Sequence, residues 1–397
     1  MAGITGLGTT YNLPNYSGML FALTPTDTPF FSAIGGLSAT PGGGQTTSPE
    51  FEWQAYDLRS AGQNVALEGA TAPTAQERTR SNISNVCQIQ QSTVAVSYTK
   101  LAATGLKSGT NNADPNPVTN ELDWQLEQEL KAMVRDIEWS FINGTYQKPT
   151  DNTTARKTRG LLQAITTNVT NFGTAVTSGV TGTAATDLVT KTAHGLANGT
   201  AVLFTVLTGG TGLALDTVYY VIGQTANTFQ VSRTVGGPAV DILTDYSALN
   251  YTVLGDLTYD RLGELMQGVY DNGGITEQGT AALMAPSHLK RKVSKVLASA
   301  FAGYQETSRN VGGVNMTVVT TDFGELNLVT NRHMPRGTLA VVSLEQCQPV
   351  YLDTPSKGHF FAEELAKTGA NESTMLYGEV GLAYGSELSH GKLLNVA

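Results

Sequence analysis

One stretch of the sequence, residues 120–143, constrains the fold more than any other because it has the period of a long amphipathic helix. Its apolar side chains recur every three or four positions and form a single stripe. Asn120 can cap the start, where two acidic residues follow in the positively polarised first turn. Asn143 and Gly144 would supply a left-handed stop, so about 23 residues should form a rod about 35 Å long. The stripe consists of Leu126, Leu130, Met133, Val134, Ile137 and Phe141.

The leader segment FALTPTDTPFFSAIGG, residues 21–36, has neither a helical period nor the alternation of a strand. Pro25 and Pro29 interrupt any helix through it, and each proline pushes the residue before it toward extended geometry. We therefore expect an extended, aromatic segment whose apolar side chains have no local core to enter.

Two alternating stretches predict a pair of strands. FEWQAYDL, residues 51–58, and NVCQIQQSTVAVSYT, residues 85–99, each place apolar side chains on one face. A long polar segment that includes EGATAPTAQERTRSN separates them, so we expect an extended hairpin and not a tight one. Such a hairpin exposes both faces unless something outside it provides cover. The residues that share one face would be Phe51, Trp53 and Ala55 on the first strand and Val94, Val96 and Tyr98 on the second.

The rest of the chain predicts an α+β body interrupted by a small all-β domain. Residues 161–255 are rich in Thr, Val and Gly and contain short β-type runs bounded by turn residues. Two amphipathic helices follow, and the tail alternates as several strands. The helix stripes are Leu262, Leu265, Met266 and Val269, then Leu289, Val293, Val296 and Leu297, with Ser287 opening the second helix.

Charge and cysteine content narrow the class of protein. Charged residues make up only 14% of the 397 residues, which suggests that surface is buried by assembly. The net charge of −9 argues against a general nucleic-acid binder, and the first basic residue is Arg59. Cys87 and Cys347 are expected to be reduced thiols. The start lacks the features of a signal peptide, and no apolar run is long enough to span a membrane.

A search for chemistry yields no catalytic, metal or cofactor site. The five histidines lie far apart, and no zinc-protease motif, nucleophile elbow or P-loop occurs. The basic run HLKRKVSK, residues 288–295, is interpreted as the solvated face of a helix, with a nucleic-acid patch as the weaker alternative. Glu77, Arg78 and Arg80 lie on the long polar connection, where a solvated loop and ion pairing between subunits remain equally open.

The order of these parts, an aromatic arm, a long hairpin, one long helix and a mixed body, resembles the major capsid proteins of tailed bacteriophages. Those proteins have the Hong Kong 97 capsid fold. The residues that carry the resemblance are LTPTDTPFFSAIG at 23–35, FEWQAYDL at 51–58, RSNISNVCQI at 80–89 and the helix at 121–141.

The resemblance implies an assignment of each segment of the chain. The core would comprise an N-terminal arm, an extended loop, a peripheral domain with a spine helix at 120–143, and an axial domain. The inserted β-rich domain would lie on the outer face of a shell. The ranges are 1–50 for the arm, 51–100 for the loop, 101–160 for the peripheral domain, 161–255 for the insertion, 256–349 for the axial domain and 350–397 for a return to the peripheral domain.

The same resemblance implies a structural subunit, not an enzyme, that needs no cofactor. It would assemble with itself into hexamers and pentamers of an icosahedral shell, enclosing double-stranded DNA without sequence-specific contact. A portal protein, a separate scaffolding protein and possible decoration proteins would be further partners. Assembly would take place in the host bacterial cytoplasm, without a membrane, and the product would be the virion capsid.

Contacts between subunits would explain how the apolar side chains of the leader are buried without a local core. Burying one apolar side chain of this size is worth about 1.5–3 kcal/mol, so a few could hold an arm on a neighbour. Phe30, Phe31 and Ile34 are therefore predicted to lie on a neighbouring subunit. The full set of expected contact residues is Phe21, Phe30, Phe31, Ile34, Trp53, Glu77, Arg78 and Arg80.

Two other classes stay open from the sequence. A tail-tube or surface-layer subunit would also suit β-rich modules and low charge, although the helix at 120–143 does not suit it. An enzyme, for instance one that cleaves polysaccharides, would need a convergent acid/base set, and the sequence reveals none.

Overall fold

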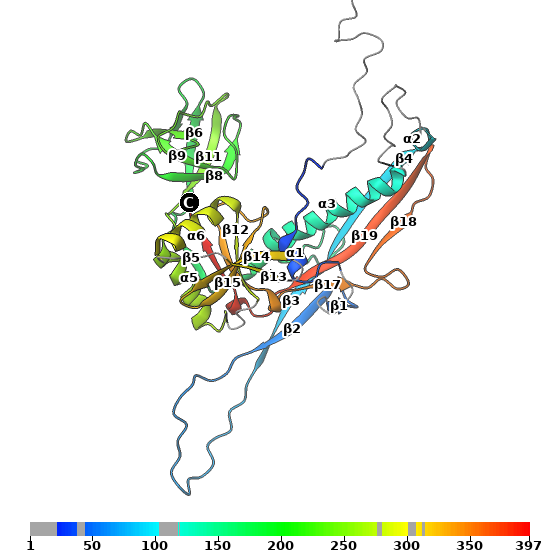
Figure 1. The fold of residues 1–397 in the computed structure, drawn as a ribbon, viewed down its shortest axis with the longest axis vertical. Helices are drawn as coiled ribbons and strands as arrows, with labels where there is room; N and C mark the ends of the chain where they lie inside the picture. The colour runs from blue at the N-terminus through cyan, green and yellow to red at the C-terminus, as the bar shows by residue number, and fades with distance from the viewer. Residues whose placement is uncertain are drawn as a thin grey trace, which may run out of the picture.

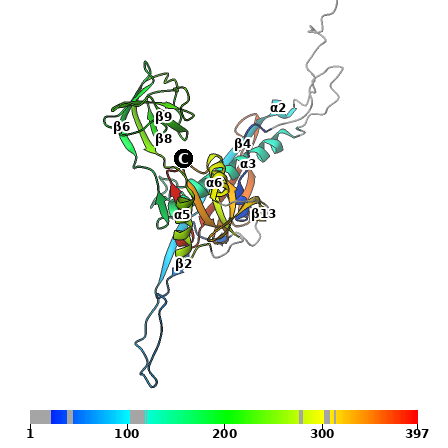
Figure 2. The same cartoon turned by 60° about the vertical axis from the view of Figure 1, so that its left-hand side comes forward.

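The computed structural model describes residues 22–37, 44–102, 118, 120–275, 280–300, 307–311 and 314–397. It has a central body of sheet and helices, a long spine that leaves the body on one side, and a separate β-barrel (Figure 1). A thin hairpin projects from the body away from the barrel, and the view in Figure 2 shows the same arrangement. The α+β class predicted from the sequence is confirmed.

The spine consists of helix α3, Glu121–Asn143, lying along a narrow sheet (Figure 1). The Asn120 side chain accepts hydrogen bonds from the backbone N–H groups of Leu122 and Asp123, so the predicted cap is confirmed. The C-terminal half of the predicted stripe is buried against the sheet, including Ile137 and Phe141. The strands of this sheet are β1 (Gly44–Thr46), β17 (Gln348–Leu352), β19 (Asn371–Ala383), β18 (Phe360–Glu364) and β4 (Gln88–Ser97).

The end of α3 differs from the predicted left-handed stop. Gly144 has a φ of −55°, which any residue can adopt. Glycine is nevertheless required, because a Cβ here would lie 2.3 Å from the Ser140 carbonyl oxygen and 2.7 Å from that of Thr158. The helix ends where another segment of the chain crosses it closely.

A seven-stranded sheet forms the body and is covered on both faces. Its central strand, β12 (Ala281–Ala285), alternates: Met284 faces the core around α3, whereas Leu283 faces helices α5 (Tyr259–Asp271) and α6 (Ser287–Ala300). Both predicted helices are confirmed. The strand order is β13 (Thr307–Val311), β14 (Val314–Thr321), β15 (Gly324–Thr330), β12, β16 (Leu339–Ser343), β20 (Gly391–Leu394) and β5 (Val169–Asn171).

The inserted domain is a closed six-stranded barrel with its own aromatic core. It begins later than the predicted residue 161, because α4 (Leu161–Ala164) and β5 belong to the body, and Leu161 is fully buried beside α3. The strands are β6 (Thr177–Thr183), β7 (Leu188–Thr190), β8 (Ala201–Thr208), β9 (Val218–Ile222), β10 (Thr228–Ser232) and β11 (Tyr246–Val253).

The chain end is shared between the two sheets. Strands β17 to β19 run in the spine, but β20 pairs with β16 and β5 in the body, where Leu393 is fully buried. The range 350–397 is therefore not wholly a return to the spine. Two short 3-10 helices, Leu344–Gln346 and Glu387–Ser389, directly precede β17 and β20 in the chain.

The projecting hairpin is built differently from the prediction. Strand β2 (Glu50–Tyr56) pairs antiparallel with β3 (Arg80–Val86), whereas β4 pairs with β19 in the spine. The predicted partner strand at 85–99 is therefore wrong, because Val94 and Val96 are buried in the spine. Tyr98 is exposed and begins the short helix α2 (Tyr98–Ala102).

Candidate assembly surfaces

The aromatic leader packs inside its own subunit. It forms a short helix, α1 (Pro29–Ala33), that starts at the proline, because the fixed φ of proline suits the first helical position. Phe30 and Phe31 are each 1% exposed, and the Phe31 ring meets Phe141 of α3 edge-on at 5.7 Å between centroids. The prediction that Phe30, Phe31 and Ile34 lie on a neighbouring subunit is wrong, since the core that covers them comes from distant parts of the same chain.

A buried carboxylate, Glu138 of α3, fixes this short helix to the spine. The backbone N–H of Phe30 donates to its Oε1 at 3.0 Å, and that of Phe31 donates to its Oε2 at 2.6 Å. The Asn331 side chain donates to Oε1 as well. Outside this contact, Arg332 pairs with Asp27 at 2.7 Å. Helix α1 is thus held by the buried carboxylate and by an outer ion pair.

The sequence pattern marks Glu138 as an exception within the helix stripe. Position 138 follows Val134 by four residues and precedes Phe141 by three, so a carboxylate stands inside the apolar stripe. Burial raises the pKa of Glu138 to about 7, although the two backbone donors and Asn331 oppose that rise. A buried carboxylate is stable only when hydrogen-bond donors contact its oxygens.

This pKa predicts a pH dependence of stability. In the folded subunit the Glu138 carboxyl keeps its proton up to about pH 7, whereas in the unfolded chain it loses the proton near pH 4.5. The stabilisation that the protonated carboxyl gives to the folded state is therefore lost as the pH rises from 4.5 to 7. Over this pH range, the titration of Glu138 should lower the free energy of unfolding of the unassembled subunit by up to about 3 kcal/mol. Urea unfolding at pH 5 and pH 8 would measure it, with Glu138→Gln as the comparison. An equal pH dependence in the two proteins would contradict the assignment.

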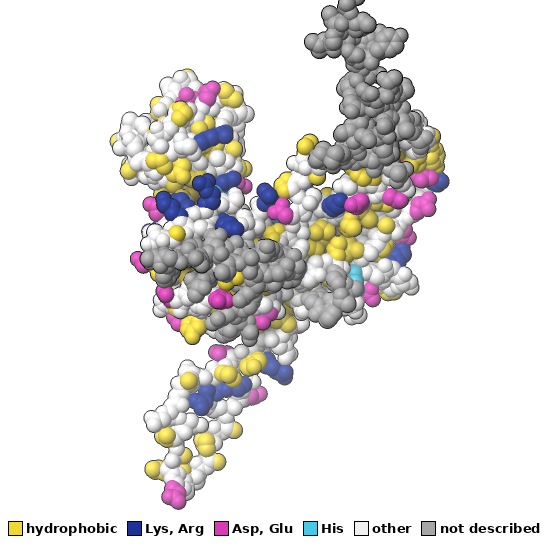
Figure 3. Space-filling model, in the orientation of Figure 1, with side chains coloured by type: hydrophobic (Ala, Val, Ile, Leu, Met, Phe, Trp, Pro, Cys, Tyr) yellow, Lys and Arg dark blue, Asp and Glu magenta, His cyan; other side chains and the backbone are white. Residues whose placement is uncertain are grey.

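Unlike the buried leader, the hairpin is open to solvent: every residue from Tyr56 to Asn82 is exposed. Within residues 57–79, the backbone hydrogen bonds described are local turns, from Val65 to Gln63 and from Ala70 to Leu67. Figure 3 shows this ribbon standing clear of the body. Large apolar side chains on it are uncovered in the single chain, a pattern typical of a binding surface. They are Tyr56, Leu58, Val65 and Leu67, the last 86% exposed.

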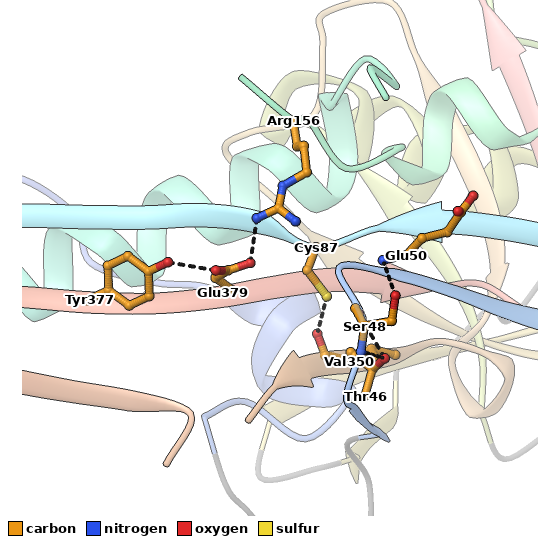
Figure 4. A network of polar contacts seen from close by, with 8 residues as sticks. All are labelled: Thr46, Ser48, Glu50, Cys87, Arg156, Val350, Tyr377 and Glu379. Atoms are coloured by element: carbon orange, nitrogen blue, oxygen red, sulfur yellow. Dashed lines mark hydrogen bonds and ion pairs between the residues drawn. The ribbon is translucent and has the colours of Figure 1, made fainter. Parts of the chain in front are cut away.

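The root of the hairpin is firmly fixed, in contrast to its tip. Cys87 lies between β3 and β4, where its backbone N–H donates to Pro49 at 2.8 Å and its thiol contacts the Val350 carbonyl (Figure 4). Burial raises the pKa of Cys87 to about 12, so it is an inert thiol. Nearby, Glu379 accepts from Arg156 at 2.8 Å and from Tyr377 at 2.6 Å. The hairpin is thus a ribbon on a rigid base.

The remaining expected contact residues fall into three situations. Trp53 is half-buried in its own subunit, where its indole N–H donates to the Gly385 carbonyl at 2.8 Å. Glu77, Arg78 and Arg80 are exposed on the hairpin, and their pairing with another subunit stays a prediction. Phe21 lies outside the described residues.

Within the described ranges, no three His, Cys, Asp or Glu side chains are grouped as they would be around a metal ion. No helix in the same ranges has the length and hydropathy required to cross a membrane.

Comparisons with known proteins agree with this architecture. The family model described as SU10 major capsid protein matches residues 3–397. The major capsid protein of Escherichia phage Phieco32 is 25% identical over 403 residues, covering 96% of this chain and 94% of that protein. The capsid asymmetric unit of cyanophage A-1(L) is 10% identical, with a TM-score of 0.52 over 97% of each chain. The capsid of cyanophage P-SCSP1u is 10% identical, with a TM-score of 0.49 over 96% of this chain and 92% of that one.

The projecting hairpin, the spine helix and the mixed body together form the Hong Kong 97 capsid fold, with the barrel as an insertion. The family match covers nearly the whole chain, including the barrel. The chain therefore belongs to the SU10 major capsid protein family, and it is the subunit that forms the shell of a tailed phage.

Proposed function

We propose that the shell is held together largely by residues 57–79 of the hairpin lying across a neighbouring copy of the chain, in hexamers and pentamers. The observation that carries the proposal is the contrast between a fixed root and an uncovered apolar ribbon. Three large apolar side chains on it, Leu58, Val65 and Leu67, would gain about 1.5–3 kcal/mol each from cover. Glu77, Arg78 and Arg80 would then form ion pairs at the edge of that contact.

The other partners belong to the same proposal and are supported by family membership. The shell would enclose double-stranded DNA without sequence-specific contact, which agrees with a net charge of −9. A portal protein, a separate scaffolding protein and possible decoration proteins would complete it. Assembly would take place in the host bacterial cytoplasm, the barrel would lie on the outer face, and the subunit would have no catalytic activity.

Electron microscopy of the concentrated, purified protein tests the proposal. Closed, curved shells are the expected result, because hexamers and pentamers of one subunit generate curvature. Open tubes or flat sheets would instead favour a tail-tube or surface-layer subunit. Discrete, unassembled particles at every concentration, with the scaffolding protein present as well as without it, would contradict assembly through self-contact.

A further inference from the structure

A cavity of about 490 Å³ lies between the barrel and helix α6, and we call it the basic cleft. Its cationic lining comes from three separate segments of the chain: the end of β10, helix α6 and the loop before β16. Dark blue side chains gather at this junction in Figure 3. The cationic residues are Arg233, Arg291, Lys292, Lys295 and Arg336.

The basic run of α6 turns out to face this cleft. Arg291, Lys292 and Lys295 lie three, four and seven positions after His288, so all four share one face of the helix. The sequence suggested that this face is solvated, and Arg291 and Lys295 are indeed exposed, but they line a cavity whose opposite wall is the inserted barrel. Five cations are thus gathered in one cavity of a chain whose net charge is −9.

Most of this positive charge is uncompensated. Lys292 lies 3.9 Å from Asp256 and also donates to the backbone oxygen of Ala397. Within the described residues, no ion pair is formed by Arg233, Arg291, Lys295 or Arg336. Like charges held together in a concave site repel one another and concentrate the field on any anion that enters.

His288 adds an unused polar group to the same cavity. Both of its ring nitrogens are buried, and neither has a hydrogen-bond partner within the described residues. Burial, Arg336 and Lys292 lower its pKa to about 4, so the ring is neutral near pH 7. A neutral imidazole carries one N–H donor, which a bound oxyanion could accept. Buried polar atoms without partners ordinarily indicate a missing ligand or water.

We propose that the basic cleft binds a compact polyphosphate anion, of the size of inorganic tripolyphosphate or the triphosphate group of a nucleotide. Three of its five cations are guanidinium groups, whose planar fork matches phosphate oxygens in pairs. The cavity volume falls in the range of small-molecule sites. Arg233 approaches from the barrel and Arg291 from α6, so the ligand would join the two parts.

Other anions fit the cleft less well. A cavity of this volume equals a sphere about 10 Å across, whereas the major groove of a DNA duplex alone is about 12 Å wide. A duplex could touch the rim but could not reach cations on both walls. An acidic peptide would offer single carboxylates spaced along a chain, which deliver less charge to one small volume than consecutive phosphates do.

Titration calorimetry of the full-length, unassembled protein with sodium tripolyphosphate at 150 mM NaCl tests this proposal. We expect saturable binding, and we expect Arg291→Gln with Lys295→Gln to weaken it at least tenfold, about 1.4 kcal/mol, because two charge-assisted hydrogen bonds to phosphate would be lost. Lys131→Gln with Lys357→Gln, two exposed lysines outside the cleft, is the matched control and should bind normally. Equal affinity in both double variants would overturn the proposal.

A second measurement guards against misfolding of the cleft variant. Because removing two like charges relieves repulsion, its thermal midpoint without ligand should equal or exceed that of the original protein. A lower midpoint would mean that these cations have a structural role, which would contradict the proposal. Sodium sulfate at matched ionic strength should raise the midpoint less than tripolyphosphate does, and an equal rise would likewise reject specific binding.

Two further ligands identify the source of the phosphates. ATP binding more tightly than tripolyphosphate would point to a nucleotide, and equal affinity would point to the phosphates alone. Hexaglutamate and a 20-base-pair duplex complete the set. Tighter binding of either one than of tripolyphosphate would replace the polyphosphate proposal with an acidic peptide or with nucleic acid.

Discussion

Phe31→Ala is expected to lower the free energy of unfolding of the unassembled subunit by about 3–5 kcal/mol. The Phe31 side chain is 1% exposed and packs edge-on against Phe141, so its removal leaves a cavity between α1 and the spine. Urea unfolding followed by far-UV circular dichroism measures the change. Leu23→Ala is the matched control in the same leader, because that side chain is 97% exposed and its loss should cost less than about 0.5 kcal/mol.

The opposite result would restore the interpretation that the sequence suggested. If Phe31→Ala left the stability of the isolated subunit unchanged but blocked assembly, the leader would be covered by a neighbouring copy. The buried contacts of Phe30 and Phe31 with Glu138 argue for the subunit's own core.

The double substitution Leu58→Ser with Leu67→Ser should weaken assembly and leave the stability of the isolated subunit almost unchanged. Both side chains are exposed on the hairpin, so the stability of the isolated subunit should change by less than about 0.5 kcal/mol. Loss of two covered side chains at about 1.5 kcal/mol or more each should raise the concentration needed for assembly at least about 100-fold. Light scattering and electron microscopy over a concentration series would measure it.

Val235→Ser with Leu243→Ser provides the control for that experiment. These residues are exposed on the barrel to a similar degree, and the proposal gives them no part in holding the shell together. Assembly at the original concentration by both double variants would contradict a role for the hairpin. Loss of assembly by both would show only a general sensitivity to surface polarity and would equally count against that role.

Elements with a strong local pattern were predictable from the sequence. Helix α3 was located to within one residue, because its stripe runs for more than four turns and Asn120 marks its start. The stripes of α5 and α6 were predictable for the same reason. In each case a period of 3.6 residues lies within one window of sequence, and a capping side chain marks the start of α3 and of α5.

Strand pairing and the fate of the leader were not predictable in this way. The stretch at 85–99 alternates equally well for pairing with β2 or with β19, and only the burial of Val94 and Val96 beside the spine decides between them. Phe30 and Phe31 are covered by residues about a hundred positions away, which no local pattern reveals. Glu138 was detectable as a carboxylate inside an apolar stripe.

The basic cleft illustrates a third limit. The charges of α6 were visible as HLKRKVSK, and their spacing on one helix face could be read directly. What they face depends on where the inserted barrel folds back, and Arg233 comes from within that insertion. A charged helix face can therefore be predicted locally, whereas its partner surface is a property of the tertiary structure.

Limited trypsin digestion of the free subunit and of purified shells tests the central claim most directly. Arg59 and Arg78 both lie in the exposed ribbon, so trypsin should release the segment 60–78 rapidly from the free subunit. In assembled shells a neighbouring copy should cover the ribbon and slow this cleavage at least tenfold, as mass spectrometry of the fragments would record. Cleavage at the same rate in both states would contradict an account in which the hairpin joins one subunit to the next.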